Sequence, residues 1–172
     1  MKRAAFILLT LVTLSFSQKV GGCSCNHQGA FLTVAPKTSL VALVKVIRYL
    51  SFKDIYGYAT AMSMEVEVVE VYKGQEERRT FIVWGDTGNL CRPYLSEFAE
   101  DTCYVIAFDR AGDGRHGYTH KGERPTDYTI SCCGDYWLAV DYAQQIAVGA
   151  ITDSDTQIAL AELKAKLQTN TE

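Results

Sequence analysis

Short apolar runs separated by turn residues make up most of this chain, which is the pattern of an all-β domain. Residues 40–50 are almost continuously apolar and β-branched, as in a buried strand. Residues 62–71 alternate apolar and polar side chains, and the alternation slips at 69–71, which predicts a β-bulge. Three further runs predict strands over 79–84, 103–108 and 128–133. Five such strands predict a small closed barrel.

The segments between these strands are rich in turn-forming residues. Residues 52–59 contain a glycine, an aspartate and three aromatic side chains and predict a hairpin loop, and 73–75 predict a tight turn. Residues 109–125 form a polar, glycine-rich excursion. Because its part from 112 to 125 has few apolar side chains, we expect that part to contribute little burial and the barrel to tolerate its replacement by a short turn.

The hydrophobic period changes near the C-terminus. Apolar residues recur there at approximately helical spacing, at Ile158, Leu160, Leu163 and Leu167. The spacing predicts an amphipathic helix over 155–168 that packs on the barrel, with Asp153 or Ser154 as its cap.

The first 22 residues have the layout of a secretory signal peptide: basic residues, an apolar stretch and small residues before a cleavage site. Residues 23–172 then form one domain of a secreted or extracellular protein, periplasmic or on the outer surface if the source is bacterial. Cleavage after Gly22 makes Cys23 the first residue, whereas cleavage after Ser17 makes it Gln18. In a bacterial lipoprotein Cys23 would instead be acylated on sulfur, which would remove it from disulfide bonding.

Composition excludes several classes of function. The net charge of −3 does not favour nucleic acid, and no second apolar run reaches the length of a membrane span. Nothing indicates a cofactor or an enzyme, and we expect a monomer. His27, His116 and His120 are possible metal ligands, but glycines around the latter two favour a loop over a dedicated metal site.

The six cysteines all follow the leader, at Cys23, Cys25, Cys91, Cys103, Cys132 and Cys133. An even number in an exported chain predicts three disulfides, with fifteen possible connectivities. Adjacent residues in a strand point to opposite faces, so Cys132 and Cys133 suit two different bridges.

Several ordered motifs resemble the N-terminal domain of the tissue inhibitors of metalloproteinases. They are Cys23-Ser24-Cys25, Asp54-Ile55-Tyr56-Gly57, Val71-Tyr72-Lys73-Gly74, Cys91, Tyr104-Val105-Ile106-Ala107 and Thr129-Ile130-Ser131-Cys132. The resemblance implies a mainly β fold: a five-stranded, OB-type closed barrel of the netrin-like kind with a C-terminal α-helix. It also implies Cys23–Cys91 and Cys25–Cys132 bridges, which leaves Cys103 and Cys133 for each other, although either Cys132 or Cys133 could be the partner of Cys25.

The resemblance further implies inhibition of an extracellular zinc metalloprotease. The α-amine and carbonyl of Cys23 would chelate the catalytic zinc of that protease, which keeps an open position for water. Ser24 would enter the specificity pocket. Two groups of residues would complete the protease-binding surface: Cys25, Asn26 and His27 on one side, and Leu90, Cys91 and Arg92 on the other. Two bridges within three residues would hold this wedge in place before binding.

This sequence also departs from the family. Leu32 stands where the family has a further cysteine, and the second, cysteine-rich domain is absent from the sequence given. The alternative function is therefore a netrin-like module that binds extracellular proteins without inhibiting them. The mature N-terminus distinguishes the two, because a chain beginning at Gln18 could not chelate through Cys23.

Overall fold

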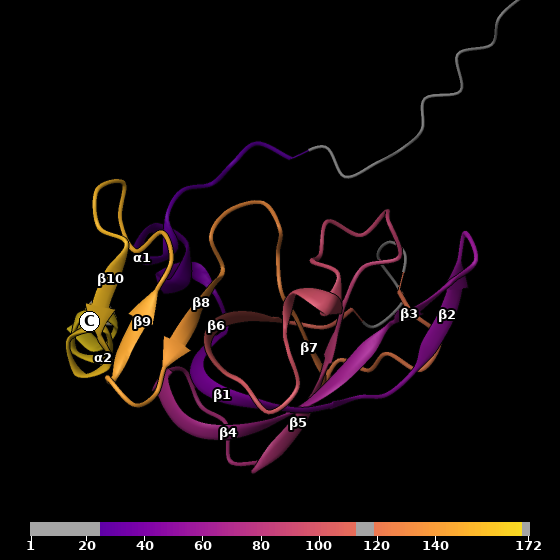
Figure 1. The fold of residues 1–172 in the computed structure, drawn as a ribbon, viewed down its shortest axis with the longest axis horizontal. Coiled ribbons are helices and arrows are strands. Elements are labelled where there is room, and N and C mark those ends of the chain that lie inside the picture. Colours follow the sequence, from indigo (N-terminus) through magenta and orange to yellow (C-terminus); the bar gives the residue numbers. More distant parts are fainter. Residues whose placement is uncertain (1–24, 113–118, 170–172) are drawn as a thin grey trace, which may run out of the picture.

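The computed structural model describes residues 25–112 and 119–169 and confirms a closed, five-stranded barrel (Figure 1). The barrel strands are β1 (Leu40–Tyr49), β4 (Ser63–Lys73), β5 (Thr80–Trp84), β6 (Cys103–Arg110) and β7 (Tyr128–Thr129). Their order is β1-β4-β5-β7-β6, and β6 pairs again with β1 to close the ring. The β5–β7 pair is parallel, whereas the other barrel pairs are antiparallel. This arrangement is an OB-type barrel.

The predicted bulge in β4 is present. Leu43 of β1 pairs with Glu70 of β4, and Val44 pairs with Val68, so Val69 is the extra residue. Val69 is 42% exposed, whereas Val66 earlier in the strand is fully buried. The extra residue lets a long strand keep its apolar side chains in the barrel on both sides of the bulge.

The segment predicted as a hairpin loop is itself a two-stranded hairpin, formed by β2 (Phe52–Ile55) and β3 (Tyr58–Ala61). Tyr56 and Gly57 connect the strands with φ angles of 54° and 86°. Positive φ at both central residues matches the twist of a β-hairpin. The hairpin projects from one end of the barrel (Figure 1).

The C-terminal part differs most from the prediction. The strand expected over 128–133 is limited to the two residues of β7. Three strands that were not predicted extend the sheet from β6: β8 (Trp137–Asp141), β9 (Ile146–Val148) and β10 (Gln157–Ala159). The C-terminal helix α2 is confirmed but runs over Leu160–Thr169. It begins five residues later than predicted because Gln157, Ile158 and Ala159 pair with β9.

Three short helical turns complete the described structure: α1 (Phe31–Val34), η1 (Ala35–Lys37) and η2 (Leu95–Glu97). The backbone N–H groups of Phe31 and Leu32 donate to the carbonyls of Ala150 and Ile151, so α1 is held against the β9–β10 connection. Phe31 is fully buried. Within residues 25–112 and 119–169, none of the helices has both the length and the apolar character needed to cross a membrane.

Candidate functional site

Residues 25–28 form an exposed segment that is fixed to the barrel along one side. The N–H of Gln28 donates to the carbonyl of Cys133 at 2.7 Å, and the N–H of Asp135 donates to the carbonyl of Gly29 at 3.1 Å. The Tyr136 hydroxyl donates to Oε1 of Gln28 at 2.7 Å. This segment therefore has a defined position although its side chains face solvent.

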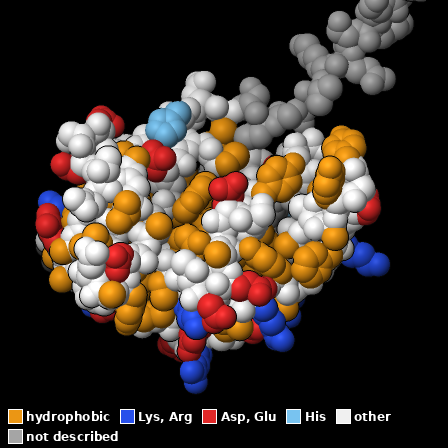
Figure 2. Space-filling view, in the orientation of Figure 1, with side chains coloured by type: hydrophobic (Ala, Val, Ile, Leu, Met, Phe, Trp, Pro, Cys, Tyr) orange, Lys and Arg blue, Asp and Glu red, His pale blue; other side chains and the backbone are white. Residues whose placement is uncertain are grey.

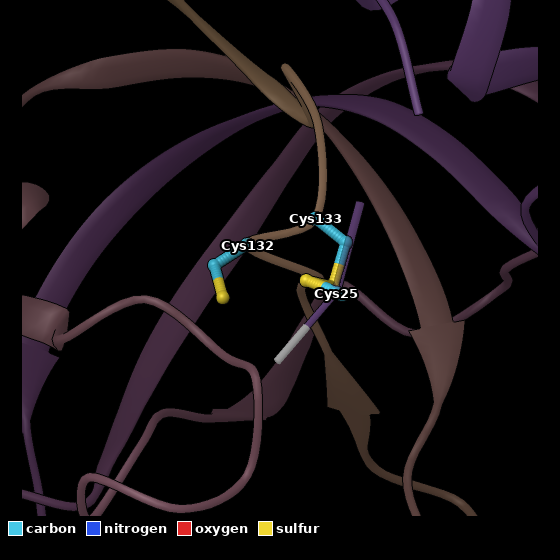
Figure 3. Close-up of side chains that lie close together, drawn as sticks. All are labelled: Cys25, Cys132 and Cys133. Carbon is cyan, nitrogen blue, oxygen red and sulfur yellow. A yellow bond between two sulfur atoms is a disulfide. The ribbon is translucent and has the colours of Figure 1, made fainter. Parts of the chain in front are cut away.

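A disulfide between Cys25 and Cys133 anchors the start of this segment (Figure 3). It joins residues 108 positions apart. Of the two partners that the sequence left open for Cys25, the structure has Cys133, so the Cys25–Cys132 and Cys103–Cys133 bridges that the resemblance implied are wrong. Cys103 is a free thiol on β6, and its pKa is raised because the thiol is partly buried.

The barrel geometry explains this correction. Cys133 is buried beside the N-terminal segment, whereas Cys132 is exposed; both lie in a bend after β7 rather than in the strand expected over 128–133. The pairing of β7 with β6 is limited to Asp109 and Arg110, at the end of β6 remote from Cys103. Next to Cys103 the partner of β6 is β8, through the Tyr104–Ala139 pair. The chain after β7 thus leaves β6 and meets the N-terminal segment instead.

The second predicted side of the surface is the loop over residues 86–92, and Asp86 organises it. One carboxylate oxygen of Asp86 accepts the backbone N–H groups of Thr87, Asn89 and Leu90 at 2.7, 3.0 and 2.7 Å. Asp86 is only 6% exposed, so these bonds satisfy a buried charge. The loop is a rigid display element rather than a loose connection.

The loop and the N-terminal segment meet at residues 132–133. The N–H of Cys132 donates to the carbonyl of Cys91 at 2.9 Å, and the next residue, Cys133, carries the bridge to Cys25. Cys91 is a disulfide cysteine. Cys23, its predicted partner, and Ser24 lie outside the described residues, so the Cys23–Cys91 bridge stays a prediction.

Arg92 has a structural partner within the protein. Its guanidinium donates to both carboxylate oxygens of Glu123 at 3.0 and 2.8 Å, and the two side chains are 11% and 0% exposed. Burial by itself would raise the pKa of Glu123, because it disfavours the charged carboxylate. The hydrogen bonds from Arg92 and from the N–H groups of His120 and Gly112 have the larger effect, so the pKa of Glu123 is lowered. Glu123 thus fastens the polar excursion to the loop over 86–92, and the tolerance of the barrel to replacement of residues 112–125 stays a prediction.

The remaining predicted residues have separate environments. His27 lies 3.5 Å from a carboxylate oxygen of Asp135, and 64% of its side chain is exposed. The Nε2 of His120 lies 2.7 Å from the carbonyl oxygen of Gly85. His116 lies outside the described residues. The two described histidines therefore belong to different local contacts.

One group of possible metal ligands appears among the described residues. The sulfur atoms of Cys25, Cys132 and Cys133 lie within 4.8 Å of one another (Figure 3). Zinc binds thiolates, and the disulfide leaves neither Cys25 nor Cys133 as a thiolate. Burial and the charge of Asp86 raise the pKa of the Cys132 thiol, which disfavours its thiolate form. The group does not fit a zinc site.

Sequence reasoning missed two residues that build this region, Asp86 and Glu123. Asp86 begins an Asp-Thr-Gly-Asn run, in which an aspartate followed by a glycine typically caps backbone N–H groups of a turn. Glu123 had no comparable signal, because its partner is 31 residues away. A scan against protein-family models found no family that matches this chain, and a search of the curated proteins found no significant match.

Proposed function

We propose that the protein is a secreted, non-enzymatic inhibitor of zinc metalloendopeptidases that acts through its N-terminal Cys-Ser-Cys segment. One observation carries the proposal. An exposed segment that begins at Cys25 is anchored by a disulfide to Cys133 and lies beside a rigid loop over residues 86–92. The bridge thereby holds Cys25, two residues after Cys23 in the sequence, at a fixed position on the barrel.

The anchoring supports the proposal through entropy. A flexible terminus loses conformational freedom when it enters a protease cleft, and each ordered residue costs about 1–2 kcal/mol of backbone entropy. Residues fixed before binding do not incur that cost again. The bridge at Cys25 and the hydrogen bonds at Gln28 and Gly29 fix the base of the segment.

The reactive atoms in this proposal belong to Cys23. Its neutral α-amine and its carbonyl oxygen would bind the zinc of the target as a five-membered chelate and displace the zinc-bound water. An α-amine has an ordinary pKa of about 7.7–8.0, so a sufficient fraction is neutral at physiological pH. Ser24 would occupy the specificity pocket, and Asn26, His27 and Leu90 would contact the rim of the cleft.

The test compares two forms of the protein, one beginning at Cys23 and one with a single alanine before Cys23. The extension converts the amine into an amide nitrogen, which is a poor zinc ligand, and leaves the bridges in place. We expect inhibition of a panel of zinc endopeptidases by the first form and a loss of at least about a hundredfold in the extended form. The Cys25–Cys133 bridge and the melting temperature of both forms serve as controls.

Two results would count against the proposal. Equal inhibition by both forms would exclude chelation by the terminus. No inhibition by the form that begins at Cys23, with its bridges intact, would exclude the inhibitor function.

A second function is favoured by the β2–β3 hairpin. Phe52, Tyr56 and Tyr58 are 58%, 96% and 77% exposed. Figure 2 shows hydrophobic side chains at the surface over this hairpin. Exposed aromatic groups on a protruding element are typical of a surface that binds another protein. The binding-module function predicts that neither form inhibits any protease and that both forms capture the same extracellular protein. It also predicts that Tyr56→Ser abolishes this capture.

A further inference from the structure

A large pocket lies between the β2–β3 hairpin, the loop over 86–92 and residues 119–121. Its volume is about 820 Å³. This lies in the range of pockets that enclose small organic ligands. Its lining includes Phe52, Lys53, Met62, Trp84, Leu90 and Lys121. The pocket is separate from the Cys25–Cys133 region, although the loop over 86–92 contributes to both.

The floor of the pocket is apolar and rigid. Met62 and Trp84 belong to a second hydrophobic cluster, distinct from the main core of the barrel. The Nε1–H of Trp84 donates to a carboxylate oxygen of Asp127 at 2.9 Å, which fixes the indole. The ring of His120 stacks on the indole with centroids 5.2 Å apart, and its Nε2 lies 2.7 Å from the carbonyl oxygen of Gly85. A ligand would therefore meet aromatic groups that are already ordered.

The charge of the pocket contrasts with that of the protein. The lining contains two lysines, Lys53 and Lys121, and no carboxylate, in a chain with a net charge of −3. Both lysines are exposed, and neither forms an ion pair with another described residue.

The described acidic groups of the neighbouring loops each have partners of their own, although only Glu123 and Asp127 have a cation among them. Asp86 accepts three backbone N–H groups, Glu123 is paired with Arg92, and Asp127 accepts from Trp84 and lies 3.6 Å from Arg124. The two lysines are the charged groups of the lining itself, which therefore carries a positive charge.

We propose that this pocket binds an amphipathic organic anion, with an apolar aromatic body on the Met62–Trp84 floor and a carboxylate or sulfonate group facing Lys53 and Lys121. The apolar floor supplies most of the binding free energy by removing the body of the ligand from water. The lysines select the anion and increase the rate of association. Hydroxyl groups of Ser51, Thr87 and Thr119 in the lining provide further donors.

The first experiment uses 8-anilinonaphthalene-1-sulfonate as the probe and follows the amide resonances of the isotopically labelled chain. We expect a dissociation constant of about 10–100 μM and chemical-shift changes centred on Thr87, Leu90 and Lys121. Mapping by amides distinguishes pocket binding from adsorption to partly unfolded chains. Changes centred elsewhere, or no change at about 1 mM probe, would overturn the proposal.

The second experiment tests the charge. Lys53→Glu and Lys121→Glu should each weaken probe binding by about tenfold, because each reverses a charge near the anion. Lys37→Glu is the matched control: Lys37 is an exposed lysine outside the lining, and its substitution should leave the dissociation constant unchanged. N-phenyl-1-naphthylamine has the same aromatic body without the sulfonate and should bind more weakly than the sulfonate. Equal effects of all three substitutions, or tighter binding of the neutral analogue, would refute recognition of an anion.

A third probe separates a small ligand from a protein partner. Polyglutamate carries many carboxylates but no aromatic body, and we expect it to leave the pocket amides unchanged at low millimolar carboxylate. If polyglutamate shifts these amides and the sulfonate does not, the pocket is a docking surface for an acidic protein and the proposal is wrong.

Discussion

The buried Arg92–Glu123 pair should be a main fastening between the excursion and the barrel, and Glu123→Gln tests this. Glu123 accepts four hydrogen bonds, two from Arg92 and one each from the N–H groups of Gly112 and His120. A glutamine keeps one acceptor oxygen, but its NH₂ group faces donors. The substitution also leaves the Arg92 guanidinium, 11% exposed, without a counter-charge.

The magnitude follows from this geometry. Removing one partner of a buried ion pair typically costs about 3–5 kcal/mol. Glutamine retains part of the hydrogen bonding, so we expect a loss at the lower end, about 3 kcal/mol. For a domain of this size such a loss lowers the melting temperature by about 10 °C.

The assay is urea unfolding followed by circular dichroism, with disulfides intact and at neutral pH. Glu67→Gln is the matched control. Glu67 also receives two bonds from an arginine, Arg79, but that arginine is 86% exposed. Exposed pairs contribute about 0–1 kcal/mol, so the control should remain close to the parent protein.

Acid provides a second readout for the same pair. The pKa of Glu123 is lowered in the folded protein, so the folded state binds fewer protons than the unfolded state. The stabilisation is fully present above the unfolded pKa of about 4.3 and is lost as the pH falls through the folded pKa. The difference between parent and Glu123→Gln should therefore shrink as the pH falls below about 4. If Glu123→Gln costs no more than Glu67→Gln at pH 7, the pair is not a fastening and the reasoning is refuted.

Three further predictions concern the barrel, the loop and the bridges. Glu76→Gln should lose about 1–2 kcal/mol at pH 7, because hydrogen bonds from Arg78 lower the pKa of Glu76 to about 2 but the Arg78 side chain is 40% exposed and screened by water. The substitution should also flatten the fall in stability between about pH 4 and 2; acid unfolding identical to that of the parent protein would contradict this. Asp86→Ala should cost about 2 kcal/mol and shift the amide resonances of the loop over 86–92, because three N–H groups lose their acceptor. Peptide mapping without reduction should recover Cys25 linked to Cys133 and Cys103 as an alkylatable thiol; a Cys103–Cys133 peptide would overturn the structure at that point.

Much of the barrel could be predicted from the sequence, because its strands are specified by local periodicity. The alternation over 62–71 gave both the strand and its bulge at Val69, since a change of phase moves every following side chain to the other face. The helix was predicted from apolar spacing, but its start was wrong. Ile158 fits a helical period equally well, and only its pairing with Ala147 of β9 makes it a strand residue.

The strands β8 and β9 were missed for a related reason. They are short, and the segment over 137–148 includes polar turn residues that obscure a period of two. Their strand conformation is stabilised by pairing with β6 and with each other, which is a tertiary effect.

The sequence by itself determined the long strands of the barrel, the bulge in β4 and the presence of a bridge at Cys25. The tertiary structure decided which groups meet there. Cys132 and Cys133 are adjacent and chemically identical, and the choice of Cys133 depends on a backbone that brings Gln28 against it. Arg92 was predicted as a binding residue, but the fold pairs it with Glu123. The pocket between the hairpin and the loops has no sequence pattern, because its walls come from segments that are far apart in the chain and meet only in the folded protein.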